Sequence, residues 1–539
     1  MLSKILNGQS KSITGAAIIL AAATLVSQIV GLLRDHIFAH YFGAGPAMDA
    51  YYAAFKIPNL VYNLLIVGAL SSGFIPTFTK LFTNSDDKSP AWKLANNVLN
   101  ITAICLGGLS LLGIIFTPAI TPIIAPGFSF ATRQMVTTFT RIMFGSTFLL
   151  GLSMVVGGIL QSLRSFVLYS LAPIFYNVGI IIGAVFLVPA MGINGLAWGV
   201  VLGAALHLSM QTYSSYVNGY RWKWILNWRD KSTNLIWKLM VPRTLGLAIS
   251  QFNLIIVTIL ASLLPVGSVT IFNYANNLQG VPTGLIGIPF ALAVFPVLSA
   301  SVAKGDKDEF IKNLSSTMRQ IIFLIIPISI VFMLVRAQIV RVVLGSGEFD
   351  WTATIQTADA LALFSLSLFA QSLIPLFARA FYALSNTKTP FIIGVISELF
   401  SIIAALLLMR PLGVSGLALA VSIGAILNCL MLAVALRGVY KTLDGERIWA
   451  SFLRIIIAAI PMAIIIQLLK YPLAEIFDQT HFWGIFAQGA VAGVAGLAIY
   501  VIICYILKVP ELIQLKDSLQ RRWLKFKNVT VVESISNNE

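Results

Sequence analysis

Apolar runs of about 20 residues recur along the whole chain, and short polar segments separate them. A helix needs about that many apolar residues to cross the hydrocarbon core of a bilayer, where each backbone group must find its partner within the segment. The pattern predicts an all-α integral membrane protein with fourteen transmembrane helices. The predicted spans are 13–42, 58–79, 94–117, 136–162, 166–190, 193–217, 239–264, 269–302, 313–335, 356–382, 389–409, 412–436, 448–469 and 483–507.

Composition and charge agree with this reading. The chain is 58% hydrophobic and 10% charged, and its mean hydropathy is +0.89. With the N-terminus inside, the predicted cytoplasmic segments hold 25 of the 36 basic residues and the opposite side holds 6, as the positive-inside rule expects. The net charge of +16 therefore reflects topology, with both termini cytoplasmic. Because the basic residues are spread over short loops, we expect no binding of nucleic acid.

The chain lacks the sequence patterns of an enzyme. Cys105, Cys429 and Cys504 all lie in predicted spans without a CxxC pair, and we interpret them as small apolar fillers. No Ser/His/Asp set, P-loop or metal-spaced cluster occurs in the sequence. We therefore predict no catalytic chemistry and no bound cofactor.

An internal repeat divides the chain. Gly192-Ile-Asn-Gly-Leu-Ala and Gly413-Val-Ser-Gly-Leu-Ala lie 221 residues apart, and Ser27-Gln28 recurs as Ser250-Gln251. Such a constant offset marks a duplication. Because the offset contains six spans, both copies enter the membrane in the same direction, as in transporters whose halves are related by an axis along the membrane normal. The repeat predicts two pseudo-symmetric six-helix lobes plus two C-terminal helices.

The predicted domains follow from the repeat. They are the N-lobe at 1–217, an interfacial cytoplasmic linker at 218–238, the C-lobe at 239–440, the last two spans at 441–509 and a cytoplasmic amphipathic tail at 510–539. The linker holds three Trp among cations from Tyr220 to Arg229, which predicts a helix at the headgroup level. Helical spacing of apolar and basic residues from Pro510 to Lys527 predicts a second surface helix, with 528–539 loose.

Charged residues inside the first span indicate a polar path. Arg34 and Asp35 lie about 20 residues into span 13–42, and charged groups at such depth cost several kcal/mol unless they face a protected, wet interior. A Gly-rich break follows, and Asp49 and Lys56 supply another acid and base before Pro58. The alternative for Arg34 and Asp35 is a local ion pair that fixes the kink of this helix.

These residues form a motif that resembles a known family. Ser27-Gln-Ile-Val-Gly-Leu-Leu-Arg-Asp, Phe42-Gly-Ala-Gly, Asp49-Ala-Tyr-Tyr-Ala-Ala-Phe-Lys-Ile-Pro-Asn, Gly68-Ala-Leu-Ser-Ser-Gly-Phe-Ile-Pro and Ala125-Pro-Gly-Phe are similar to the MurJ/MviN lipid II flippases of the multidrug/oligosaccharidyl-lipid/polysaccharide (MOP) exporter superfamily. The resemblance implies a two-lobed transporter with a positively charged central cavity and a groove between helices 13 and 14 for a polyprenyl tail.

The resemblance also implies a function in the bacterial inner membrane. A peptidoglycan precursor, lipid II, would move from the inner to the outer leaflet by alternating access, in the service of cell-wall synthesis and cell shape. The implied partners are a polyprenyl-pyrophosphate-linked glycan lipid, membrane lipids and cell-wall synthesis proteins, and a sodium or proton gradient or the membrane potential would drive transport. The alternatives are a flippase for another polyprenyl-linked glycan, a drug or cation exporter of the same superfamily, and a non-transporting envelope scaffold.

Site residues follow from the same resemblance. Arg34 matches a family arginine, and arginine suits pyrophosphate because its planar fork makes paired charge-assisted hydrogen bonds. Other family arginines are replaced here by Gln28, Tyr62 and Asn277, and acidic positions by Val67, Asn276 and Gly280. The implied substrate-binding set is Arg34, Asp35, Gln28, Asp49, Lys56, Tyr62, Asn276 and Asn277. The alternatives are gating or loop structure for the Asp49 and Lys56 pair, and interhelical hydrogen bonds for the amides.

A cation site is implied in the second lobe. Some family members bind sodium through a carboxylate and side-chain oxygens, and Glu398 with Asn253 and Asn428 would form such a set here. The alternative is a protonated glutamic acid hydrogen-bonded to a neighbouring helix, which would not attract a cation. The other arginines in or near spans are interpreted as snorkelling towards water; they are Arg141, Arg243, Arg319 and Arg454.

Overall fold

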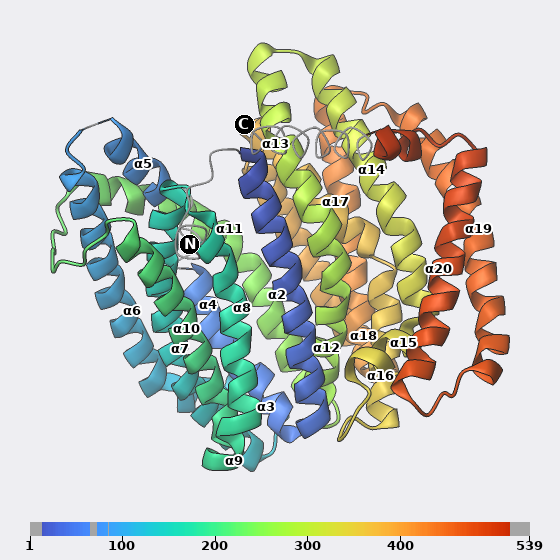
Figure 1. Cartoon of the computed structure of the whole chain (residues 1–539), viewed down its shortest axis with the longest axis horizontal. Coiled ribbons are helices and arrows are strands. Elements are labelled where there is room, and N and C mark those ends of the chain that lie inside the picture. Colours follow the sequence, from blue (N-terminus) through green and yellow to red (C-terminus); the bar gives the residue numbers. More distant parts are fainter. Residues whose placement is uncertain (1–12, 65–72, 85, 518–539) are drawn as a thin grey trace, which may run out of the picture. The chain divides into compact units, whose positions relative to one another are not determined.

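The structure, a computed structural model, describes residues 13–64, 73–84 and 86–517, and within these ranges it contains helices, turns and irregular segments but no strand (Figure 1). The chain divides into two compact units. Unit 1 comprises Met1–Tyr274, Val343–Thr357 and Ile402–Leu417, and unit 2 comprises Ala275–Val342, Ala358–Ser401 and Ala418–Glu539. The predicted N-lobe therefore falls wholly in unit 1, whereas the predicted C-lobe is divided between the units.

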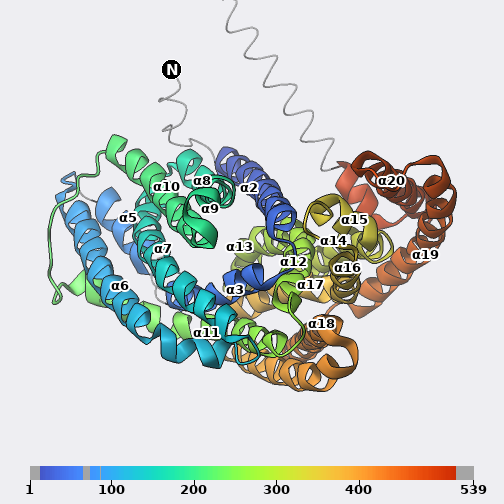
Figure 2. The same cartoon turned by 90° about the horizontal axis from the view of Figure 1, so that it is seen from below.

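Unit 1 is a bundle of long helices. Its elements are α2 (Ile13–Phe42), α3 (Pro46–Ala54), α4 (Lys56–Tyr62), α5 (Ile75–Thr83), α6 (Ser89–Ile124), α7 (Phe130–Ser162), α8 (Phe166–Ile182), the π-helical turn η3 (Gly183–Leu187), α9 (Val188–Met191), the 3₁₀ turn η4 (Gly192–Asn194), α10 (Gly195–Val217), α11 (Lys231–Ser262) and the first half of α12 (Ser268–Pro282). Helix α7 packs between α6 and α10, α10 also packs on α8, and α8 contacts α2 (Figure 2). Side-chain caps fix two starts: Ser129 accepts the Thr132 N–H, and Asp230 accepts the Thr233 N–H.

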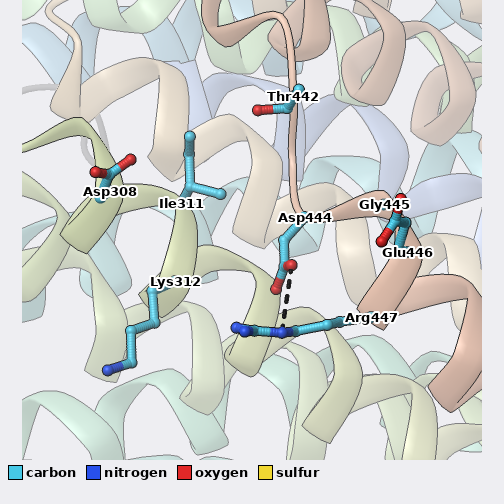
Figure 3. A pocket seen from close by; sticks show the side chains of 8 residues that line it. All are labelled: Asp308, Ile311, Lys312, Thr442, Asp444, Gly445, Glu446 and Arg447. Carbon is cyan, nitrogen blue, oxygen red and sulfur yellow. Dashed lines mark ion pairs between the residues drawn. The ribbon is translucent and has the colours of Figure 1, made fainter.

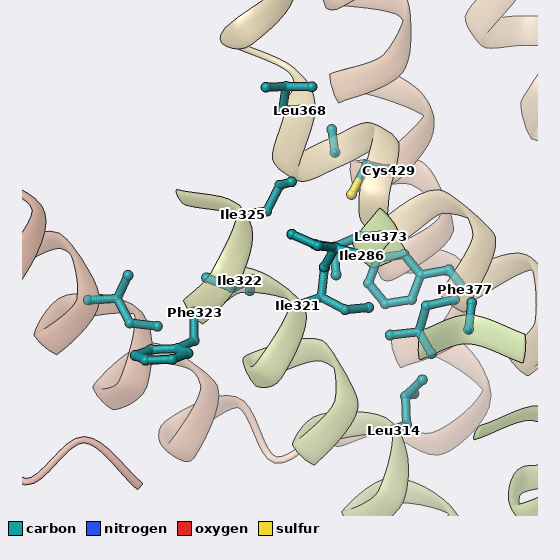
Figure 4. Packing of buried hydrophobic residues seen from close by; sticks show 14 of the residues in the cluster. Ile286, Leu314, Ile321, Ile322, Phe323, Ile325, Leu368, Leu373, Phe377 and Cys429 are labelled. Carbon is teal, nitrogen blue, oxygen red and sulfur yellow. The ribbon is translucent and has the colours of Figure 1, made fainter. Parts of the chain in front are cut away.

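Unit 2 surrounds an apolar core of its own. Its further elements are η5 (Thr283–Gly287), α13 (Ile288–Lys304), α14 (Lys307–Leu334), α15 (Arg336–Leu344), α16 (Trp351–Ser365), α17 (Leu368–Ala383), α18 (Lys388–Tyr440), α19 (Gly445–Ile476) and α20 (Phe482–Ile506), of which α15, α16 and α18 extend partly into unit 1. Helix α14 supplies Phe323 and Ile325 to this core, and α17 supplies Leu373 and Phe377 (Figure 4). Helices α19 and α20 pack against each other as a hairpin.

Two pairs of predicted spans are double-length apolar stretches that reverse at a glycine. One stretch is Phe166–Val217, and its chain turns at Gly192, where φ is +68°. The other is α18, which has 53 residues and breaks at Gly413, where φ is +57°. Ser401 Oγ donates to Ala420 O at 3.1 Å across this break, although 19 residues of straight helix would span about 28 Å. Helix α18 therefore folds back on itself.

By length and composition, eight helices in the described part of the chain could cross a membrane, or nine if the α16 and α17 pair, bent by 46°, is one span. Two of the eight are the double-length stretches just described, each long enough for two crossings of a core about 30 Å thick. Part of the predicted span 58–79 lies outside the described residues. The total of fourteen stays a prediction.

The prediction of a helix in the linker is wrong. Residues 220–227 are extended, and α11 begins only at Lys231. Three asparagine side chains of α6 donate hydrogen bonds to backbone carbonyls of this segment. These carbonyls therefore bind another element instead of accepting the hydrogen bonds of a local helix.

The interpretation of Arg319 as a snorkelling residue is also wrong. Its Nη1 donates to Glu511 Oε1 at 2.5 Å, and the two side chains are only 12% and 1% exposed. Ser451 Oγ donates to the other carboxylate oxygen at 2.9 Å. This buried pair ties the segment after α20 to α14 and α19. The segment is helical from 510 to 517, so the predicted tail helix begins against the protein, and its remainder lies outside the described residues.

Candidate functional site

Arg34 is held in a fixed position in unit 1 by its neighbour on α2 and by a residue on α8. Its Nε and Nη2 donate to Asp35 Oδ1 at 3.0 and 2.7 Å, and its Nη1 donates to Asn177 Oδ1 at 3.0 Å. These bonds use three of the five guanidinium N–H groups. The Arg34 side chain is 21% exposed, whereas that of Asp35 is 3% exposed. The cation is therefore anchored and still reachable, and the anion lies behind it.

Asn177 was not among the predicted site residues. Its Nδ2 donates to Pro173 O at 3.1 Å, one turn earlier in α8, which leaves its Oδ1 turned to Arg34. The signal in the sequence is an amide inside an otherwise apolar span. That signal gives the helix but not the partner, because the contact joins residues 143 positions apart.

Aromatic side chains surround the base of the Arg34 and Asp35 pair. Phe38 lies one turn on, and the Arg34 Cζ is 5.9 Å from its ring centroid. Phe38 packs edge-on against Tyr51 of α3, which packs in the same way against Tyr52. The rings form an apolar wall on this side of the guanidinium, and they strengthen its electrostatic interactions by lowering the local dielectric constant.

Asp49 is a structural cap in this structure. Its Oδ2 accepts the Gly267 N–H at 2.6 Å, and its Oδ1 accepts the N–H and hydroxyl of Thr270 at 2.9 and 2.7 Å. These groups lie at the start of α12, where free N–H donors and the helix dipole favour a carboxylate. Asp49 is 2% exposed. These contacts stabilise the loop before α12, and a role of Asp49 in substrate binding stays a prediction.

Lys56, Tyr62 and Gln28 also belong to unit 1 but do not meet at one point. Lys56 Nζ donates to Asn273 Oδ1 at 3.3 Å, which joins α4 to α12. Tyr62 packs against the apolar cluster that contains Phe78. Gln28 lies on α2, seven residues and two helical turns before Asp35 on the same face. Its Oε1 is buried, and no described residue donates a hydrogen bond to it.

The remaining predicted residues are divided between the units. Asn276 accepts from Gln279 Nε2 at 3.0 Å within α12 in unit 2, and Asn277 is half-buried beside it. Glu398 and Asn428 lie in unit 2, whereas Asn253 lies in unit 1. The sodium set stays a prediction. In the described residues no group of three or more His, Cys, Asp and Glu side chains is placed to hold a metal ion.

A hollow of about 430 Å³ opens in unit 2 between the start of α14 and the turn before α19 (Figure 3). Asp308 and Lys312 line one side, and Asp444 and Arg447 line the other. Asp444 accepts from Ser315 Oγ at 2.9 Å, and its other oxygen lies 3.7 Å from Arg447 Nε. Acids and bases pair here, and the hollow lies on loops predicted to be cytoplasmic, so it is a poor candidate for a path across the membrane.

Comparisons with known proteins give a consistent result. A family model described as lipid II flippase MurJ matches residues 38–487. The chain is similar to the lipid II flippase MurJ of Burkholderia cenocepacia, with 29% identity over 475 residues that cover 86% of this chain and 91% of that protein. It is also similar to the probable lipid II flippase MurJ of Vibrio cholerae, with 30% identity over 455 residues, 82% of this chain and 86% of that protein.

Solved structures give the same result for the fold. A lipid II flippase MurJ in an inward closed conformation matches with a TM-score of 0.73 and 25% identity, over 91% of this chain and 98% of that one. An inward-facing multidrug resistance MATE transporter of the MOP superfamily matches with a TM-score of 0.66 over 80% of this chain and 99% of that one. At 15% identity, the second likeness shows the fold alone.

Proposed function

Because this chain belongs to the MurJ family of lipid II flippases, we propose that it moves lipid II from the inner to the outer leaflet of the bacterial inner membrane. The observation that carries the proposal is the family match over residues 38–487. It is a multi-pass membrane protein and a transporter, and its apolar helices fit that role.

We assign the anchoring of the anionic headgroup to Arg34. A guanidinium that is 21% exposed and already oriented by two neighbours loses little further freedom when it binds a phosphate. The two N–H groups that Asp35 and Asn177 do not use can donate to one phosphate oxygen each. Pyrophosphate, with several anionic oxygens, is the part of lipid II that matches this donor set.

Asp35 limits how tightly the headgroup binds. Its carboxylate neutralises Arg34 in the empty site, so a phosphate must compete with an acid that lies 2.7 Å from the same cation. Weak, reversible binding suits a transporter, because a substrate held too tightly in one state raises the barrier to its release. In the alternating-access cycle that we propose, the lobes rock around this point while the polyprenyl tail stays in the bilayer.

A translocation assay in proteoliposomes with purified lipid II tests the proposal. The double variant Arg34→Gln/Asp35→Asn removes both charges and so leaves no buried carboxylate unpaired, which would otherwise destabilise the fold. We expect its initial rate to fall at least tenfold, as the loss of about 1.4 kcal/mol or more of charge-assisted hydrogen bonding requires. Arg34→Lys, which keeps the charge but not the fork, should give an intermediate rate.

Arg141→Gln is the matched control. Arg141 is another arginine in a predicted span, but its Nε donates to Ile114 O at 3.2 Å at an exposed site away from α2. Its loss should leave the rate within twofold of wild type. A wild-type rate in the Arg34→Gln/Asp35→Asn variant would remove Arg34 from the mechanism, and a lack of lipid II movement by the unaltered chain would refute the function itself.

A further inference from the structure

The extended linker in unit 1 is built as a surface and not as a loose connection. We call residues 220–229 the linker strap. Three asparagines of α6, which are only 1 to 3% exposed, hold its backbone along one side. Asn96 Nδ2 donates to Arg221 O at 3.1 Å, and Asn97 Nδ2 donates to Asn227 O at 2.9 Å. Asn100 Nδ2 donates to the carbonyls of residues 223 and 225 at 3.0 and 2.9 Å.

The same amides also accept from the strap. Lys223 N–H donates to Asn96 Oδ1 at 2.8 Å, and Asn227 N–H donates to Asn97 Oδ1 at 2.6 Å. The side chains of one helix thus replace the neighbouring strand that an extended segment would otherwise need for its backbone groups. Tyr220, at 4% exposure, fixes one end of the strap in the apolar cluster with Trp92. The strap is therefore held at several points along its length, and the spacing of three asparagines determines which side of it faces outward.

The outer side combines indoles with cations. Trp222, Trp224 and Trp228 are 60, 63 and 50% exposed, and the Trp222 ring is fixed to α6 because its indole N–H donates to Asn100 Oδ1 at 3.1 Å. Exposed basic residues are interleaved with them or lie at the ends of the strap; they are Arg221, Lys223, Arg229 and Lys231. Lys93 is also exposed and lies one turn before Asn96 and Asn97 on the α6 face that holds the strap. The acid next to Arg229, Asp230, is engaged as the cap of α11. The surface is thus apolar and net positive.

Its place along α6 corresponds to the edge of the hydrocarbon region. Helix α6 has 36 residues, so it is about 54 Å long and extends beyond a core of about 30 Å. Exposed residues further along α6 are wholly apolar, with Leu111, Leu112, Ile115 and Phe116 more than half exposed. Leu111 lies 11 residues after Asn100, which is about 16 Å or half the core thickness. The strap therefore lies at headgroup level when this apolar zone lies mid-membrane.

We propose that the linker strap is a binding surface for anionic phospholipid headgroups, with the cations on phosphate oxygens and the indoles at the boundary with the acyl chains. Tryptophan favours this boundary, and basic residues near it attract anionic lipids. A fully buried protein interface would not place four basic residues among its indoles, because charged residues are depleted from the core of such interfaces. This surface is independent of the transport function, since it requires no moving part and no contact with Arg34.

Native mass spectrometry of the full chain tests the proposal, with phosphatidylglycerol and phosphatidylcholine of identical acyl chains added in separate titrations. We expect tighter binding of phosphatidylglycerol. The variant Lys223→Gln/Arg229→Gln should weaken that binding roughly 30-fold at low ionic strength, since each basic residue near an anionic surface contributes about a factor of five. Both substitutions leave the strap in place, because the asparagines bind its backbone and not these side chains.

The control removes two charges elsewhere. Lys307→Gln/Lys388→Gln takes two exposed lysines from the starts of α14 and α18, which are predicted to lie on the same cytoplasmic side and have no exposed Trp beside them in sequence. This variant should change phosphatidylglycerol binding less than threefold. Equal binding of the two lipids by the unaltered chain would overturn the proposal. An unchanged preference in Lys223→Gln/Arg229→Gln, or an equal loss in the control, would also overturn it and would leave the strap as a surface for a protein partner. Circular dichroism shows that each variant is folded before the comparison.

Discussion

The two double-length hairpins, Phe166–Val217 in unit 1 and α18, are copies of each other that keep their backbone contacts and differ in their polar residues. Gly192 and Gly413 both have a positive φ at the reversal, 221 residues apart. A Cβ at Gly195 would lie 2.4 Å from the Leu187 backbone, and one at Gly416 would lie 2.2 Å from the Leu408 carbonyl, again at an offset of 221. The close backbone approach just after the reversal is thus present in both hairpins.

The polar content has diverged between the copies. Asn177, which accepts from Arg34, corresponds to Glu398 at the same offset. The offset of 223 that joins Ser27 to Ser250 places Val257, a buried apolar residue, at the position of Arg34. In the first half of the chain, the cation of α2 faces a neutral amide of the hairpin. In the second half, an acid stands at the position of the amide and a valine stands at the position of the arginine. Steric demands on glycine preserved the fold, while polar positions were free to acquire separate roles.

The largest effect should come from breaking the shared backbone approach in either copy. Gly195→Val and Gly416→Val each force a side chain into main-chain atoms that cannot move aside, which should destabilise the fold by about 3 kcal/mol in both cases. Chemical denaturation in detergent measures the free energy of unfolding. A loss confined to one variant would contradict the structural equivalence of the two hairpins.

The next effect concerns the residue that distinguishes the first copy. Asn177→Leu removes the acceptor for Arg34 Nη1 and should cost about 2 kcal/mol, because the lost hydrogen bond is to a charged group. It should also slow lipid II translocation, since Arg34 loses one of its two anchors. Asn177→Asp keeps an acceptor and serves as the control for stability. If Asn177→Leu had the same denaturation midpoint as the wild-type protein, the bond would be dispensable for stability.

A smaller difference should separate two equivalent glycines. At Gly203 a Cβ would lie 2.3 Å from the Tyr176 carbonyl oxygen, whereas at Gly424 its nearest neighbour would be Ser401 Cβ at 2.7 Å. We expect Gly203→Ala to destabilise the fold about 1 kcal/mol more than Gly424→Ala, because the overlap at Gly203 is deeper and the packed interior yields little. Parallel denaturation curves measure this difference, and equal midpoints would argue against it.

The smallest effect is expected at the turn of a third hairpin, formed by α19 and α20. This turn contains no glycine with a positive φ. Hydrogen bonds from the Thr480 hydroxyl and N–H, and then from His481, lower the pKa of Asp478 to about 2 from its usual 3.8. These contacts are complete above the usual pKa and weaken as the pH falls through about 2. Thr480→Ala should move the midpoint of the Asp478 carboxyl titration, followed by carbon NMR, back towards the usual value. A midpoint unchanged by Thr480→Ala would assign the shift to another cause.

The site could be predicted from the sequence only in part. Arg34 and Asp35 were evident because charge inside an apolar span is costly, and the mutual contact of neighbours needs no tertiary information. Asn177 could not be assigned as the partner, since an amide in an apolar helix has many possible neighbours and the contact spans 143 residues. The Asp49 cap on α12 was hidden for the same reason, because it joins positions more than 200 residues apart.

The sequence by itself determined the membrane-embedded helical class, the duplication and the family, because hydrophobic runs, a constant offset and a dense motif are local properties of the chain. Only the tertiary structure decided that the linker is an extended strap and that Arg319 pairs with Glu511. In both cases, the composition suited an interfacial helix or a snorkelling side chain. Partners distant in sequence, namely three asparagines of α6 and one buried carboxylate, bind polar groups of the strap and of Arg319 and so fix a different conformation.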